Sequence, residues 1–166
     1  MRRRTKGQSL VEMALLLPLM LVVLFGIIDF GWYVYNYATI YMATRDGAEK
    51  GSQLPPMPNK LGNMNRTSST VDVCVYNILS EIQQNAVLIP NLTSNTPSYV
   101  SISYPVKRAL GEQIEVRTSY TVQPLTPLWN LVRFGNQGRI TVSVATRRTI
   151  ETLGNNPNSP NLVACN

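Results

Sequence analysis

The sequence lacks histidine altogether and contains only two cysteines, Cys74 and Cys165, among its 166 residues. Because histidine is the commonest general base and metal ligand near neutral pH, its absence excludes most acid–base and metal sites. The two cysteines are too far apart for a C-x-x-C redox or zinc motif. The carboxylates are scattered, and no glycine-rich phosphate loop follows a predicted strand. We therefore predict no enzyme activity, no metal site and no cofactor.

Acidic residues are also scarce, nine against fifteen lysines and arginines, which gives a net charge of +6. This charge could suggest a nucleic-acid-binding protein, but it is unevenly distributed. The four cations before residue 7 leave eleven basic against nine acidic residues in the rest of the chain. That near-balance predicts no phosphate-binding surface, so nucleic acid is not an expected partner. The four N-terminal cations are Arg2, Arg3, Arg4 and Lys6.

The most prominent feature that is present is a long apolar run, in which Asp29 is the only charged residue between Met13 and Met42. A helix this long and apolar is typical of a membrane span, and the cations before it predict a cytoplasmic N-terminus. Aromatic residues follow the run instead of the small-residue cleavage site of a secretory signal peptide. We expect a single-pass protein of the cytoplasmic (inner) membrane, with the bilayer as a partner and an extracytoplasmic C-terminal domain. The aromatic residues, which are typical of a membrane-interface belt, are Phe30, Trp32, Tyr33, Tyr35, Tyr37 and Tyr41.

Two carboxylates, Glu12 and Asp29, bracket the most apolar part of this run. They are separated by roughly 25 Å along a helix, close to the ~30 Å thickness of the hydrocarbon layer, so each can lie near one boundary. Asp29 can be an interfacial carboxylate that snorkels to water, or a buried acid that binds a partner. Both interpretations stay open from the sequence.

A stripe of small residues follows the aromatic cluster at intervals of four residues. A continuing helix would place these residues on one face and permit close approach of another helix. The alternative is that the glycines only mark the fraying end of the helix. The stripe consists of Thr39, Ala43, Gly47 and Gly51.

The two cysteines lie after the predicted span and therefore on the oxidising side of the membrane, where a disulfide persists. A bridge between Cys74 and Cys165 would close a loop of about 90 residues and contribute on the order of 4 kcal/mol in the chain-entropy model. Two free buried thiols are the alternative.

The remainder of the chain predicts a small α+β domain. Apolar residues recur at helical spacing between Ser69 and Leu88, and three later segments alternate as half-buried strands do. We expect one helix packed on a three- to four-stranded, mainly antiparallel sheet. Trp129, in the connection 124–138, is predicted either to pack against the end of this sheet or to belong to a functional loop. The alternating positions are Val100, Ile102, Tyr104 and Val106, then Ile114, Val116, Tyr120 and Val122, then Ile140, Val142 and Val144.

Three ordered motifs, at residues 7–18, 26–31 and 43–48, resemble the N-terminal signature of TadE-like proteins, which are pseudopilins of the tight adherence (Tad, or Flp) pilus system. The resemblance implies cleavage between Gly7 and Gln8 by a prepilin peptidase and a role for Glu12 in recognition and assembly. After such a cut the new α-amino group would lie one helical turn from the Glu12 carboxylate, which can neutralise it. Mild departures are Met13, Thr44 and Asp46, where an aromatic residue, alanine and glutamate are common.

The resemblance implies a minor pilin or pseudopilin of a Tad-type type IV pilus apparatus that contributes to pilus assembly, adhesion and surface colonisation. Its partners would be the prepilin peptidase, other pilin and pseudopilin subunits and the Tad assembly machinery, and after assembly it could reside in a surface pilus. Asp29 is a second candidate for assembly contacts. The alternative is a single-pass membrane protein whose outer domain binds a ligand or partner and never enters a pilus. The expected organisation is a leader at 1–7, a transmembrane and stem helix at 8–52, a linker at 53–69 and an extracytoplasmic head at 70–166.

Overall fold

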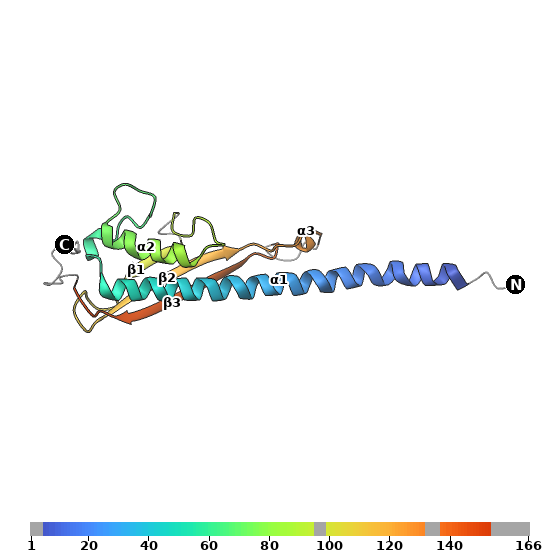
Figure 1. The fold of residues 1–166 in the computed structure, drawn as a ribbon, viewed down its shortest axis with the longest axis horizontal. Coiled ribbons are helices and arrows are strands. Elements are labelled where there is room, and N and C mark those ends of the chain that lie inside the picture. Colours follow the sequence, from blue (N-terminus) through green and yellow to red (C-terminus); the bar gives the residue numbers. More distant parts are fainter. Residues whose placement is uncertain (1–4, 95–98, 132–136, 154–166) are drawn as a thin grey trace. The chain divides into compact units, whose positions relative to one another are not determined.

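The computed structural model describes residues 5–94, 99–131 and 137–153, and Figure 1 labels its α-helices and β-strands. A long apolar N-terminal helix is followed by a small domain with a helix and a three-stranded antiparallel sheet, which confirms the predicted α+β class. The elements are α1 (Thr5–Gln53), η1 (Pro58–Lys60), α2 (Val73–Asn85), β1 (Val100–Ser103), β2 (Gln113–Val122), α3 (Leu128–Leu131) and β3 (Ile140–Thr149).

The chain divides into two compact units. Unit 1 comprises Met1–Tyr35 and Val122–Ile140, and unit 2 comprises Asn36–Thr121 and Thr141–Asn166. Helix α1 therefore contributes its first part to unit 1 and its last part to unit 2. The predicted boundaries of leader, stem, linker and head stay predictions.

In unit 1, α1 is apolar on all sides. Its most apolar 18-residue window has a mean hydropathy of 2.6, and none of that window is buried. Among the described residues, α1 is the one helix long and apolar enough to cross a membrane. A helix that is apolar all round belongs in a hydrophobic environment, because a soluble surface helix keeps one polar face.

Unit 2 is built around α2, which begins at a side-chain cap. The Asp72 carboxylate accepts hydrogen bonds from the backbone N–H groups of Cys74 (3.0 Å) and Val75 (3.4 Å), which would otherwise lack partners in the first turn. The helix then presents an apolar face at helical spacing, as its sequence predicts. Buried on this face are Cys74, Val75, Ile78, Leu79 and Ile82.

The sheet has the order β1-β2-β3. β1 and β2 pair antiparallel with Val100 opposite Thr118 and Ile102 opposite Val116. The turn before β2 is closed by a bond from Glu112 N–H to the carbonyl of Ala109 (3.1 Å). Apolar side chains of the strands are buried on one side of the sheet, so the sheet has one apolar face and one polar face, and on the polar face Glu115 of β2 is buried as well.

The polar face carries an ion-pair cluster centred on Glu115 of β2. Its carboxylate accepts hydrogen bonds from Arg147 of β3 (2.6 Å) and from Arg117 (3.1 Å). Glu115 is 8% exposed although it lies on the polar face, because the two guanidinium groups cover it. The hydrogen bond from Arg147, and to a smaller extent that from Arg117, holds the pKa of Glu115 below its usual range.

The segment that follows α1 is held to the head by bonds to its backbone carbonyls. The Tyr104 hydroxyl donates to the carbonyl of Pro56, and Arg108 donates to the carbonyls of Pro55 (2.9 Å) and Leu153 (3.0 Å). Both prolines are buried. Burial raises the pKa of Tyr104 to about 12, because the phenolate would lose its hydration there.

Candidate functional site

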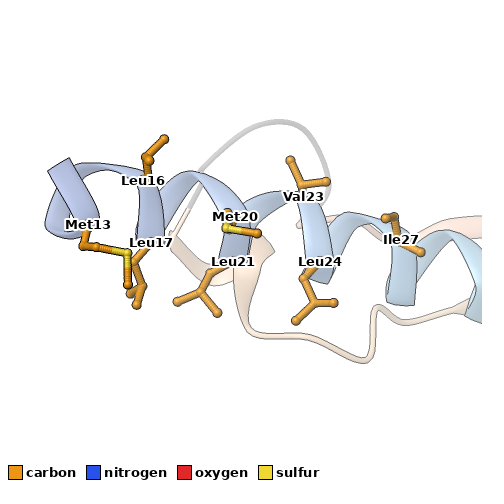
Figure 2. A pocket seen from close by; sticks show the side chains of 8 residues that line it. All are labelled: Met13, Leu16, Leu17, Met20, Leu21, Val23, Leu24 and Ile27. Atoms are coloured by element: carbon orange, nitrogen blue, oxygen red, sulfur yellow. The ribbon is translucent and has the colours of Figure 1, made fainter. Parts of the chain in front are cut away.

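Two features of unit 1 are candidates for function: the exposed surface of α1 and a buried carboxylate on the same helix. Figure 2 shows an open apolar groove along α1 whose lining comes from this single helix. It has almost no polar lining, so it lacks the few placed polar groups of a small-molecule site. Such a surface is suited to lipid chains or to another apolar helix. The lining residues are Met13, Leu16, Leu17, Met20, Leu21, Val23, Leu24 and Ile27.

Asp29 follows this surface on α1, and its side chain is buried with 2% exposure. One carboxylate oxygen, Oδ1, accepts hydrogen bonds from the backbone N–H groups of Leu125 and Thr126, both at 2.9 Å. The other, Oδ2, accepts from the Thr126 hydroxyl at 2.6 Å and from the Trp129 indole N–H at 2.9 Å. We call Asp29, Leu125, Thr126 and Trp129 the Asp29 clamp.

Further bonds attach the same connection to α1. The Trp32 indole N–H donates to the carbonyl of Gln123 (3.1 Å), and the Tyr33 hydroxyl donates to the carbonyl of Gly138. Gly138 has a φ of 71° and lies against the Trp129 ring, so that a Cβ there would be 2.6 Å from two ring carbons. Glycine is therefore required for both its backbone conformation and its lack of a side chain.

The clamp positions a segment and does not perform chemistry. Both oxygens of Asp29 are occupied by hydrogen-bond donors, so the carboxylate has little capacity left to accept a proton from a substrate. It is therefore a poor general base and has no oxygen directed at solvent. In the part of the chain that the structure describes, no group of three or more acidic or cysteine side chains could hold a metal ion.

In the structure Asp29 is buried, and its predicted role in contacts with other subunits stays a prediction. Its partners come from its own chain, 96 to 100 residues away in sequence. The sequence does not point to Thr126, and it marks Trp129 only as a packing or loop residue. The available signal was a lone intramembrane acid together with a connection that contains threonine and tryptophan, and no spacing rule pairs the two.

The small-residue stripe lies in unit 2, where α2 and β2 cover it. A Cβ at Gly47 would lie 2.4 Å from Ile82 Cγ1, and a Cβ at Gly51 would lie 3.0 Å from Ile114 Cδ1. Ala43 is fully buried and Thr39 is half-buried. At Gly47 and Gly51 the helix that closely approaches α1 is therefore α2 of the same chain.

The remaining predicted site residues are only partly described. Gly7 and Gln8 lie in the first turns of α1, and Glu12 is on its exposed surface. Cys74 is disulfide-bonded, whereas Cys165 lies outside the described residues, so the pairing of these two cysteines stays a prediction.

Part of the chain matches the model of a known protein family. The family model described as TadE-like protein matches residues 7–49, which confirms the resemblance found in the sequence. This stretch lies entirely within α1. The TadE-like family consists of structural components of a pilus system and is not an enzyme family. A search of curated proteins and a search of solved structures found no match.

Proposed function

We propose that this chain is a minor pilin or pseudopilin of a Tad-type pilus apparatus, cut by a prepilin peptidase and serving pilus assembly, adhesion and surface colonisation. One observation carries the proposal. The TadE-like match at residues 7–49 coincides with a helix in which no part of the most apolar window is buried. An exposed apolar surface of this size requires lipid or another protein to cover it.

In this mechanism α1 first stores the subunit in the bilayer as a single-pass membrane protein. Cleavage after Gly7 would leave a positively charged α-amino group on Gln8 at the membrane surface. Moving that charge into an assembly of apolar helices is costly unless a carboxylate accompanies it. Glu12 of a neighbouring subunit supplies this carboxylate, so that charge pairing and helix packing together drive lateral recruitment.

The packing of unit 2 restricts where sister subunits can bind. The two glycines of the small-residue stripe, Gly47 and Gly51, are covered by α2 and β2 of the same chain. Contacts between the stems of different subunits are therefore expected on the exposed apolar part of α1 that precedes Asp29. Most large apolar side chains there are at least 40% exposed, and they include Leu10, Leu15, Leu19 and Met20.

Intact-mass analysis of protein extracted from membranes tests the proposal. In cells that contain a prepilin peptidase, the mature chain should begin at Gln8. Gly7→Ala should leave the chain uncut, because the peptidase recognises the glycine. A chain that still begins at Met1 beside an active peptidase would contradict the proposal and favour the single-pass receptor.

The variant Glu12→Gln tests the charge of the Glu12 side chain separately from its size. This variant should impair processing or incorporation into sheared pili, because it keeps the size of the side chain and removes the charge. Glu49→Gln is the matched control, since Glu49 is an exposed glutamate on the same helix and its carboxylate lies 3.7 Å from Arg148. If Glu12→Gln and Glu49→Gln behave alike, the carboxylate of Glu12 has no role in assembly.

A further inference from the structure

We propose that residues 123–129, the clamped loop, form a second membrane-contacting element that inserts into the headgroup region of the outer leaflet. The proposal rests on the proposed function, because it requires α1 to span the bilayer. The loop would contact lipid, at the boundary between headgroups and acyl chains. Four observations within unit 1 support it.

The first is the position of Asp29 along α1. The stretch from Ser9 to Ile28 is apolar apart from Glu12 near its start. At about 1.5 Å per residue it measures about 30 Å, the thickness of the hydrocarbon layer. Asp29 immediately follows this stretch and therefore lies at the outer boundary.

The second is that hydrogen bonds hold the loop at the level of Asp29. Its carboxylate accepts both backbone N–H groups of Leu125 and Thr126 at 2.9 Å. Because these bonds join backbone to a buried side chain of α1, the loop cannot lie far from the depth of residue 29. Whatever surrounds α1 at that depth also surrounds the loop.

The third is that the tip of the loop has no free amide donor. Pro124 and Pro127 have no N–H group, and the N–H groups of Leu125 and Thr126 are both bonded to Asp29. An unpaired N–H group is costly wherever water is scarce. Four consecutive residues without a free donor therefore lower the cost of placing this loop where the headgroups meet the acyl chains.

The fourth is the apolar surface around the clamp. Leu125 is 62% exposed and Phe30, next to Asp29 on α1, is 70% exposed. Trp129 is half-buried, with its N–H bonded and its ring against Gly138. One exposed leucine on a soluble protein needs no explanation. Here it lies on a loop fixed beside a membrane span, with an aromatic residue of the kind that populates the interface.

Depth-dependent quenching tests the proposal on the full chain in vesicles of phosphatidylcholine and phosphatidylglycerol. Leu125→Cys carries a nitrobenzoxadiazole fluorophore, and phospholipids carry a doxyl quencher either near the headgroup or near the end of the acyl chain. Leu110→Cys is the matched control, because Leu110 is a 61% exposed leucine of unit 2. Leu17→Cys places the label in the interior of the span. The chain without any substitution is treated with the same fluorophore, to show whether the native cysteines react.

The label at Leu125 should be quenched more by the shallow doxyl group than by the deep one, with blue-shifted emission and protection from aqueous iodide. The label at Leu110 should be quenched by iodide alone. If the Leu125 label behaves like the Leu110 label, or is quenched most by the deep doxyl group, the proposal is overturned. If the Leu17 label is open to iodide, α1 does not span the bilayer and the proposed function fails with it.

Discussion

Replacing Gly47 by alanine should destabilise unit 2, although alanine is the better helix former. The new Cβ would lie 2.4 Å from Ile82 Cγ1 and 2.7 Å from Ile82 Cδ1, far inside van der Waals contact. The Cγ1 atom is attached directly to the branched Cβ of Ile82, and this side chain is fully buried. To remove this steric clash, α2 must shift or the Ile82 side chain must change its rotamer.

The expected size follows from two opposing effects. Overpacking of a well-packed core costs about 1–3 kcal/mol, whereas glycine to alanine inside a helix gains about 1 kcal/mol. At a distance as short as 2.4 Å the overpacking cost lies in the upper part of its range, so we expect a net loss of about 1–2 kcal/mol. In Gly51→Ala the closest atoms are terminal methyl groups, Ile114 Cδ1 at 3.0 Å and Ile78 Cδ1 at 3.3 Å, so this variant should be close to neutral.

The assay is chemical denaturation of the full chain in detergent micelles, followed by near-ultraviolet circular dichroism of the tyrosines. The reasoning is refuted if Gly47→Ala is as stable as Gly51→Ala or as the unsubstituted chain. A double-mutant cycle with Ile82→Ala locates the cause. The double variant should be more stable than the sum of the single effects, because the alanine methyl at position 47 occupies space that the shortened side chain leaves.

Three further predictions concern polar contacts. The pKa of Glu115 is lowered by the hydrogen bond from Arg147, so its stabilisation is fully present above the ordinary glutamate pKa of 4.5 and should be lost as pH falls through the lower folded value. Acid unfolding should therefore shift to a higher pH in Arg147→Met, and an unchanged midpoint would contradict this. Burial raises the pKa of Tyr104 from 10.0 to about 12, so stability should be complete below pH 10.0 and decline as the pH rises toward 12. The difference in tyrosinate absorbance between the unsubstituted chain and Tyr104→Phe should show this late titration, whereas a midpoint near 10 would contradict it. Thr126→Val removes the hydroxyl that donates to Asp29 at 2.6 Å, a bond to a charged group worth about 1.5–3 kcal/mol, and hydrogen exchange should become faster in residues 125–129 and not in α2.

Much of unit 2 was predictable from patterns among neighbouring residues. The apolar spacing of α2 and the cap at Asp72 are both local, and the helix at Val73–Asn85 falls within the predicted stretch. The alternation of apolar and polar residues located the strands, although the ends of the strands differ from the predicted ones. β1 stops at Ser103, before Pro105, which cannot donate to a ladder. β3 continues to Thr149, beyond the last alternating valine, where Arg147 pairs with Glu115 across the sheet.

The candidate site was only half predictable. The sequence identified Asp29 as exceptional, because a lone carboxylate in an apolar run is costly in a membrane. It left the environment of that carboxylate open, since a buried acid and a snorkelling acid have the same local pattern. The clamp requires Thr126 and Trp129, which lie 97 and 100 residues further along the chain.

The sequence by itself determined the apolar helix, its orientation signal and its TadE-like character, because each depends on the kind and order of adjacent residues. Only the tertiary structure decided what covers Gly47 and Gly51 and what satisfies Asp29. The physical reason is that contacts between distant segments depend on how the chain closes its loops and fills its core. A single sequence shows which groups need partners, and the folded chain shows which partners reach them.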